Sequence, residues 1–222
     1  SQMADWLSSA KLQYACSANL IDSVEPLNLT KEQAEFLNEI TDMTFRETTR
    51  DFIVNQQFRK DYWVKGARKI NPISKSLGLK SIRLLLTSRP EAVALKDNTL
   101  AGEATLNESV YKPLIDLMAD HKVRSIAQME ESLVKHGLNL SQIVQAVVVL
   151  TGQGHLSMAQ DDALAQKRHK YTQALNTHLM ELARSSGEIG YLVSPLTGGG
   201  VTVARFHQIF VLARQQGHKT PQ

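Results

Sequence analysis

Two capping boxes fix where helices begin in this chain. Thr30 is followed three residues later by Gln33, and Ser125 by Gln128. In each box the hydroxyl can accept from the third backbone amide while the glutamine side chain reaches back to the cap residue. Asn139 can cap a third helix in a similar way. Apolar residues at helical spacing follow all three positions, so the chain must contain several short amphipathic helices.

Composition limits the class of protein. The 222 residues are 42% hydrophobic and 21% charged, and the formal charge of +3 is well short of a dense basic stripe. The single cysteine, Cys16, excludes an intrachain disulfide and favours a reducing compartment. The purest apolar run, residues 146–150, is far shorter than the roughly 20 residues that span a bilayer. We therefore expect a cytoplasmic protein with no membrane partner.

The first half is predicted to be helical with a small β element. An opening helix is expected to run as far as Tyr14, and another begins at Thr44, with an apolar side and a charged side. Phe58 and Tyr62 are four residues apart, which predicts that helix continues to a stop at Gly66. Apolar residues then follow an alternating, turn-punctuated pattern, which predicts a β-hairpin or small sheet: Ile82, Leu84, Leu86, Leu100 and Leu106.

The second half is predicted to contain three short helices, a tight turn at Gly137 and then a strand in residues 155–159. This order resembles a winged helix-turn-helix domain. The fold class is therefore α+β and mainly helical. We expect a helical lobe with a small β-hairpin or sheet in residues 1–106, followed by a winged-helix-like lobe in residues 107–222.

Charge argues against nucleic acid as a partner. The segment that would read bases, residues 139–151, contains no Lys or Arg. Phosphate neutralisation dominates nucleic-acid affinity, and Gln142 and Gln145 alone cannot supply both phosphate and base contacts. We therefore expect the lobe to pack against protein. A free-standing winged-helix module that binds DNA or another protein is kept as the alternative function.

No set of residues forms a catalytic pattern. The glycine run at 197–200 lacks the lysine of a phosphate-binding loop, and the seven histidines lack metal-ligand spacing. Asp116 and Asp120 have no partner nucleophile, and the basic run 167–170 is typical of a solvated face. The sequence predicts no catalytic, cofactor-binding or metal-binding residue in this chain.

Two segments resemble a known family: residues 10–22, AKLQYACSANLID, and residues 44–68, TFRETTRDFIVNQQFRKDYWVKGAR. They are similar to the regulatory domain that follows the catalytic domain in a group of bacterial S-adenosylmethionine-dependent methyltransferases. The later segment VYKPLIDLMAD and the helices after it resemble a C-terminal winged-helix-like domain of some of these proteins, including protein lysine methyltransferases. The best-matching positions are Arg46, Glu47, Asp51, Phe52, Asn55, Phe58, Arg59, Asp61 and Gly66.

The resemblance implies a non-catalytic regulatory and substrate-docking region. Its first partner would be an N-terminal Rossmann-like methyltransferase domain in cis, which would hold S-adenosylmethionine. This chain has no strand, glycine loop and helix of that kind, so no cofactor is expected in it. The substrate would be a protein or a small molecule, and a second copy of the chain is a further partner left open.

The docking surface is predicted in residues 51–66. Aromatic side chains give large contact areas at low entropy cost, and Arg59 with Asp61 can form oriented charge pairs, as interface anchors do. The alternative is that the aromatic side chains are core and the charges face water. The candidate docking residues are Asn55, Phe58, Arg59, Asp61, Tyr62 and Trp63.

Overall fold

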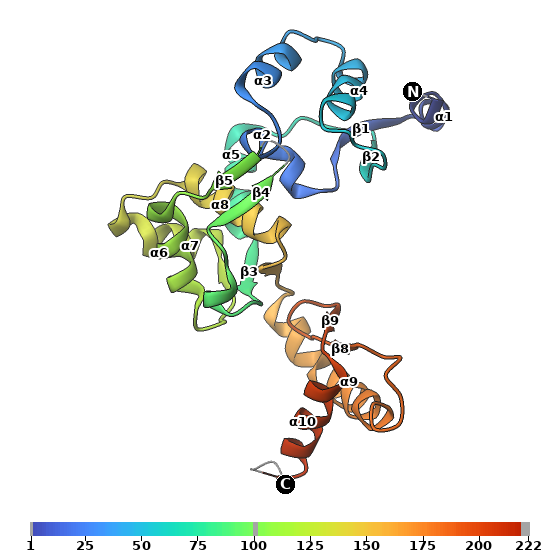
Figure 1. Ribbon diagram of the computed structural model, residues 1–222, viewed down its shortest axis with the longest axis vertical. Coiled ribbons are helices and arrows are strands. Elements are labelled where there is room, and N and C mark those ends of the chain that lie inside the picture. Colours follow the sequence, from blue (N-terminus) through green and yellow to red (C-terminus); the bar gives the residue numbers. More distant parts are fainter. Residues whose placement is uncertain (1, 100–101, 219–222) are drawn as a thin grey trace. The chain divides into compact units, whose positions relative to one another are not determined.

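The computed structural model describes residues 2–99 and 102–218, with the backbone alone described for 97–99 and 102–104 (Figure 1). The described chain is mainly helical with small antiparallel sheets, which confirms the α+β class. It divides into two compact units, one up to Ser157 and one from Met158.

The first unit contains a helical amino-terminal part followed by strands and three core helices. In chain order its elements are α1 (Gln2–Ser9), β1 (Leu12–Ser17), η1 (Leu20–Ser23), α2 (Glu25–Asn28), α3 (Lys31–Asn38), α4 (Met43–Ile53), β2 (Asp61–Lys65), α5 (Pro72–Ser81), β3 (Arg83–Leu86), η2 (Pro90–Ala92), β4 (Lys96–Thr99), β5 (Gly102–Thr105), α6 (Glu108–Met118), β6 (Arg124–Ser125), α7 (Ile126–Leu133), η3 (Val134–His136), α8 (Leu140–Gly152) and β7 (Leu156–Met158).

The helix starts read from the sequence are confirmed. Thr30 and Ser125 each form a complete capping box, and Asn139 forms a third with Gln142 at the start of α8. Gly137 adopts φ +74°, a left-handed conformation that ends η3 and allows the turn into α8. Local hydrogen-bonding chemistry was sufficient to place these helix starts.

Two helix predictions in the first half are wrong. Tyr14 lies in β1, and the helix expected through Phe58 and Tyr62 is replaced by a loop and β2. The two strands pair antiparallel, with Tyr14 opposite Trp63. The four-residue spacing of Phe58 and Tyr62 therefore had no structural meaning, because a strand partner distant in sequence decided the conformation. Farther on, β3 and the β4–β5 hairpin confirm the predicted strands, while Leu100 lies outside the described residues.

The main core of the first unit joins β3 to α6, α7 and α8. Leu84 and Leu86 of β3 are buried together with Leu114, Ile126 and Ile143 from the three helices. Strand β3 also pairs with β6, and β7 completes a three-stranded sheet. The domain boundary predicted between residues 106 and 107 runs through this core. The site of proteolytic cleavage stays a prediction. A smaller cluster beneath α3 and α4 consists of Leu29, Leu37 and Val54.

The second unit consists of α9 (Asp162–Leu182), a hairpin of β8 (Tyr191–Val193) and β9 (Gly200–Thr202), and α10 (Arg205–Gln215). The glycine run forms the hairpin turn, with Gly198 at φ +73°, and the side chains of residues 167–170 are exposed on α9. Across the described ranges, no single helix is long and apolar enough to cross a membrane. One bent pair, Ile126–His136 with Leu140–Gly152, meets the length and composition criteria jointly, at an angle of 118°.

Candidate docking site

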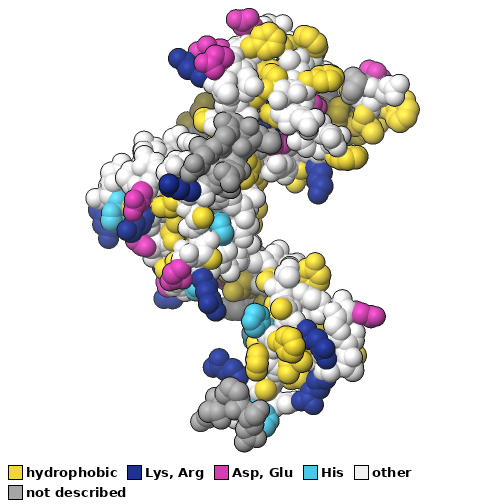
Figure 2. All heavy atoms as spheres, in the orientation of Figure 1, with side chains coloured by type: hydrophobic (Ala, Val, Ile, Leu, Met, Phe, Trp, Pro, Cys, Tyr) yellow, Lys and Arg dark blue, Asp and Glu magenta, His cyan; other side chains and the backbone are white. Residues whose placement is uncertain are grey.

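Helix α4 turns its aromatic side chains outward and its charged side chains inward. Phe45 and Phe52, seven residues apart on one face, are 61% and 84% exposed, whereas Arg50 on the opposite face retains 6% of its surface. Figure 2 shows apolar side chains gathered on the surface over α3 and α4. An amphipathic helix in a free globular domain has the reverse orientation, so this outer face is suited to contact another protein surface.

Two further aromatic side chains are exposed beyond the end of α4. Phe58 is 85% exposed and Tyr62 is 60% exposed, and Asn55 lies on the surface with φ +53°, a left-handed conformation that asparagine tolerates, just past the end of α4. The interpretation of Phe52, Phe58 and Tyr62 as core side chains is therefore wrong. We call Phe45, Phe52, Phe58 and Tyr62 the aromatic face.

Arg59 lies inside and connects three elements. Its guanidinium donates to Asp61 on the same chain segment at 3.0 and 3.1 Å, to Asp51 of α4 at 3.1 Å and to Glu47 of α4 at 3.0 Å. It also donates to the Tyr14 hydroxyl of β1 at 2.9 Å. All three guanidinium nitrogens therefore have partners, and Arg59 joins β1, α4 and β2.

Trp63 reaches the same network through an aromatic contact. Its ring meets that of Tyr14 edge to face, with centroids 5.8 Å apart, and the Arg59 guanidinium lies 5.3 Å from the Tyr14 centroid. The Tyr14 hydroxyl donates to Glu47 at 3.1 Å, and Glu47 also pairs with Arg46 at 3.2 Å. Arg59, Asp61 and Trp63 are thus inner residues of the predicted docking segment, whereas Asn55, Phe58 and Tyr62 are outer residues.

Partial burial shifts the pKa values in this network. Burial, with the Glu47 carboxylate nearby, raises the pKa of Tyr14 to about 12. Burial raises the pKa of the Asp51 carboxyl, although its hydrogen bonds to Arg59 act in the opposite direction. Burial disfavours the charge of Arg59, but hydrogen bonds to Asp61 and Asp51 outweigh it and hold the pKa above its usual range. The guanidinium therefore remains charged.

A cavity of about 460 Å³ adjoins the network. Met3 and Leu7 of α1 and the Trp63 ring provide apolar walls, while Arg59 and its carboxylate partners provide a polar wall. Its size and mixed lining are those of a small-ligand or side-chain pocket. Among the described residues, no group of three or more His, Cys, Asp or Glu side chains is arranged to hold a metal ion.

A protein-family model matches the segment that forms this site. The model is described as a predicted methyltransferase regulatory domain. Residues 1–65 match it. The resemblance noted in the sequence is confirmed, and the matched segment includes α1, β1, α4 and β2, which carry the aromatic face and the Arg59 network.

The relatives of this chain are longer than the chain itself. An uncharacterized protein of Synechocystis sp. is 32% identical over 221 residues, which are 100% of this chain and 44% of that protein. Two structures of PKMT2 from Rickettsia typhi, one in complex with AdoHcy, are 14% identical, with TM-scores of 0.50 and 0.52. They match 98% of this chain and 47% and 46% of PKMT2, and show a shared fold. The chain thus spans about half the length of these relatives.

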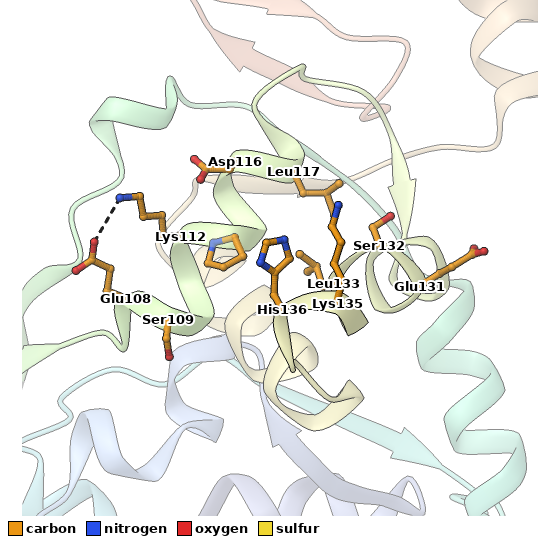
Figure 3. A pocket seen from close by; sticks show the side chains of 11 residues that line it. Glu108, Ser109, Lys112, Asp116, Leu117, Glu131, Ser132, Leu133, Lys135 and His136 are labelled. Atoms are coloured by element: carbon orange, nitrogen blue, oxygen red, sulfur yellow. Dashed lines mark ion pairs between the residues drawn. The ribbon is translucent and has the colours of Figure 1, made fainter.

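A second hollow lies in the first unit, away from the regulatory-domain segment. Figure 3 shows Lys112 and Leu117 of α6 and Lys135 and His136 of η3 around it. It holds about 1000 Å³, and Lys112 pairs with Glu108 at 3.5 Å. Side chains of both charges line it, so its charge favours no single class of ligand.

The sequence analysis missed the roles of Tyr14, Glu47 and Arg50. Tyr14 meets Arg59 only because β1 pairs with β2, and 45 positions separate the two residues in the chain. Local signals for the two strands were the alternation of Leu12, Tyr14 and Cys16 and the strand-favouring run Tyr62, Trp63 and Val64. Arg50 was placed on the charged side of its helix, and nothing local indicated that this side faces inward.

Proposed function

We propose that this chain is the regulatory and substrate-docking region of a bacterial S-adenosylmethionine-dependent methyltransferase, and that the aromatic face is its docking surface. The partner is a methyltransferase domain in cis, which holds S-adenosylmethionine and carries out the reaction on a protein substrate. The observation that carries the proposal is the outward aromatic side of α4, within a segment that matches the regulatory-domain family.

Two further observations support a partner in the same polypeptide. The Synechocystis relative aligns with the whole of this chain and is more than twice as long. PKMT2 aligns with 98% of this chain, is also more than twice as long, and was solved in complex with AdoHcy. A domain in cis is present at high effective concentration, so an aromatic face of modest area suffices to hold it. The four aromatic side chains are large contact groups of the kind that dominate interface free energy.

The winged-helix-like part is proposed as a protein-packing module. Helix α8, the counterpart of a base-reading helix, is largely committed to the core through Ile143, Ala146, Val147, Val149 and Leu150. It carries no basic side chain, so phosphate contacts would have to come from elsewhere. We therefore propose no nucleic-acid partner.

The experiment replaces Phe52 and Phe58 by Ser in the full-length parent protein and measures methyl transfer to its substrate. Each side chain is largely exposed, so we expect this chain to melt as the unmodified protein does, within about 0.5 kcal/mol. We expect methyl transfer to fall at least about tenfold, because losing an interface anchor typically costs 2 kcal/mol or more. Tyr171→Ser, at a 68% exposed position on α9, is the matched control. Unchanged methyl transfer in the Phe52/Phe58 variant would refute the docking surface.

A further inference from the structure

Arg50 is a buried cation whose hydrogen-bonding capacity is not met. Its side chain retains 7% of its surface, and its Nη2 atom is buried without a hydrogen-bond partner. The nearest carboxylate oxygen, Oδ1 of Asp22, is 3.6 Å from Nη2, which is too long for a hydrogen bond. Buried guanidinium groups are normally both ion-paired and hydrogen-bonded, and Arg50 has the ion pair with Asp22 but no hydrogen bond from Nη2.

Two cavities of the first unit meet at this side chain. One holds about 250 Å³ and the other about 210 Å³, and Arg50 lines both. The larger cavity is also lined by Lys60, Arg59 and the polar side chains of Ser17 and Asn19. Its lining is rich in hydrogen-bond donors, and its size suits a small polar ligand.

The carboxylates in this cavity already have partners. Asp22 accepts from the Ser17 hydroxyl at 2.7 Å and from the Asn19 amide at 3.0 Å, and Asp51 accepts from Arg59.

Lys60 differs from Arg59, because it is exposed and belongs to no ion pair among the residues that the structure describes. Three cationic and two carboxylate side chains line the cavity. Lys60 thus offers a charge outside any described ion pair, and Arg50 offers a buried Nη2 group without a hydrogen-bond acceptor.

We propose that this cavity binds a small oxyanion, a carboxylate or a phosphate group, between Arg50 and Lys60. A planar guanidinium binds such a group through two parallel hydrogen bonds, and a lysine ammonium adds a point charge from the opening of the cavity. The site differs from the aromatic face in its ligand, a small anion in place of a protein surface, although Phe58 of the aromatic face also lines this cavity.

The test uses the whole 222-residue chain. Thermal unfolding is followed while inorganic phosphate or acetate is titrated at constant ionic strength, with potassium chloride making up the balance. A saturable rise in melting temperature with phosphate alone assigns a phosphate site, and a rise with acetate assigns a carboxylate site. A response to neither anion overturns the proposal.

Two lysine variants locate the binding. Lys60→Gln removes an exposed charge from the cavity and is expected to weaken the apparent affinity about tenfold, the effect of one charge-assisted contact. Lys65→Gln removes an exposed lysine of β2 that does not line the cavity, and is expected to leave the response unchanged. Equal responses from the two variants overturn the assignment, since binding would then lie elsewhere. Arg50→Gln is expected to abolish the response if the variant folds.

Discussion

Arg50 and Phe52 stand two residues apart on α4, yet Arg50 is 6% exposed and Phe52 is 84% exposed. The burial of the charged residue follows from what lies inside α4. Carboxylates of α4, β2 and the segment after β1 gather there, so the inner space is polar and receives the arginines. The aromatic side chains are left outside, where a second surface can bury them and gain the hydrophobic free energy that the free chain lacks.

Arg59 is predicted to be essential to the fold of the regulatory-domain segment. Arg59→Gln leaves three carboxylates near one another without their shared cation, and we expect a loss of about 3 kcal/mol of unfolding free energy, as when one partner of a buried ion pair is removed. Both tryptophans, Trp6 and Trp63, lie in this segment, so denaturation followed by tryptophan fluorescence reports on it directly. Lys65→Gln is the control for loss of a single positive charge. If Arg59→Gln unfolded at the same denaturation midpoint as the wild type, the structural role of the network would be contradicted.

Stability is predicted to fall at alkaline pH through Tyr14. Its pKa rises from 10.0 to about 12 in the folded chain, so between these values the folded state keeps a proton that the unfolded state has lost. This contribution is fully present below pH 10 and is lost as pH rises toward 12. Tyr14→Phe should flatten the decline of melting temperature in that window, whereas Tyr171→Phe, at an exposed position, should leave it unchanged. The same slope in wild type and Tyr14→Phe would show that Tyr14 is not the group responsible.

A cut within residues 97–107 is predicted to leave the two fragments bound to each other. Leu84 and Leu86 lie before this segment and share the main core with α6, α7 and α8, which follow it. Association would survive because the buried apolar surface, and not the chain connection, holds the parts together. Size-exclusion chromatography of the nicked protein under native conditions measures this. Two separate peaks would instead support independent lobes divided at residue 106.

Much of the helical fold was determined by the sequence itself. Thr30, Ser125 and Asn139 place helix starts through hydrogen bonds to residues three positions away, and Gly137 supplies a left-handed turn that other residues rarely adopt. Such interactions are complete within one turn of chain, so reading neighbouring residues is enough. The docking role predicted for the segment around Arg59 stays a prediction.

Tertiary structure decided the conformation and the contacts of residues 51–66. The strand conformation of Tyr62 and Trp63 depends on pairing with β1, and Arg59 finds Tyr14 only across that pairing. Likewise, the spacing of Phe52 and Arg50 defines two faces of a helix but carries no information on which one is buried. That choice depends on the polar groups supplied by β1 and β2, because a buried charge is tolerated only where opposite charges and hydrogen-bond partners surround it.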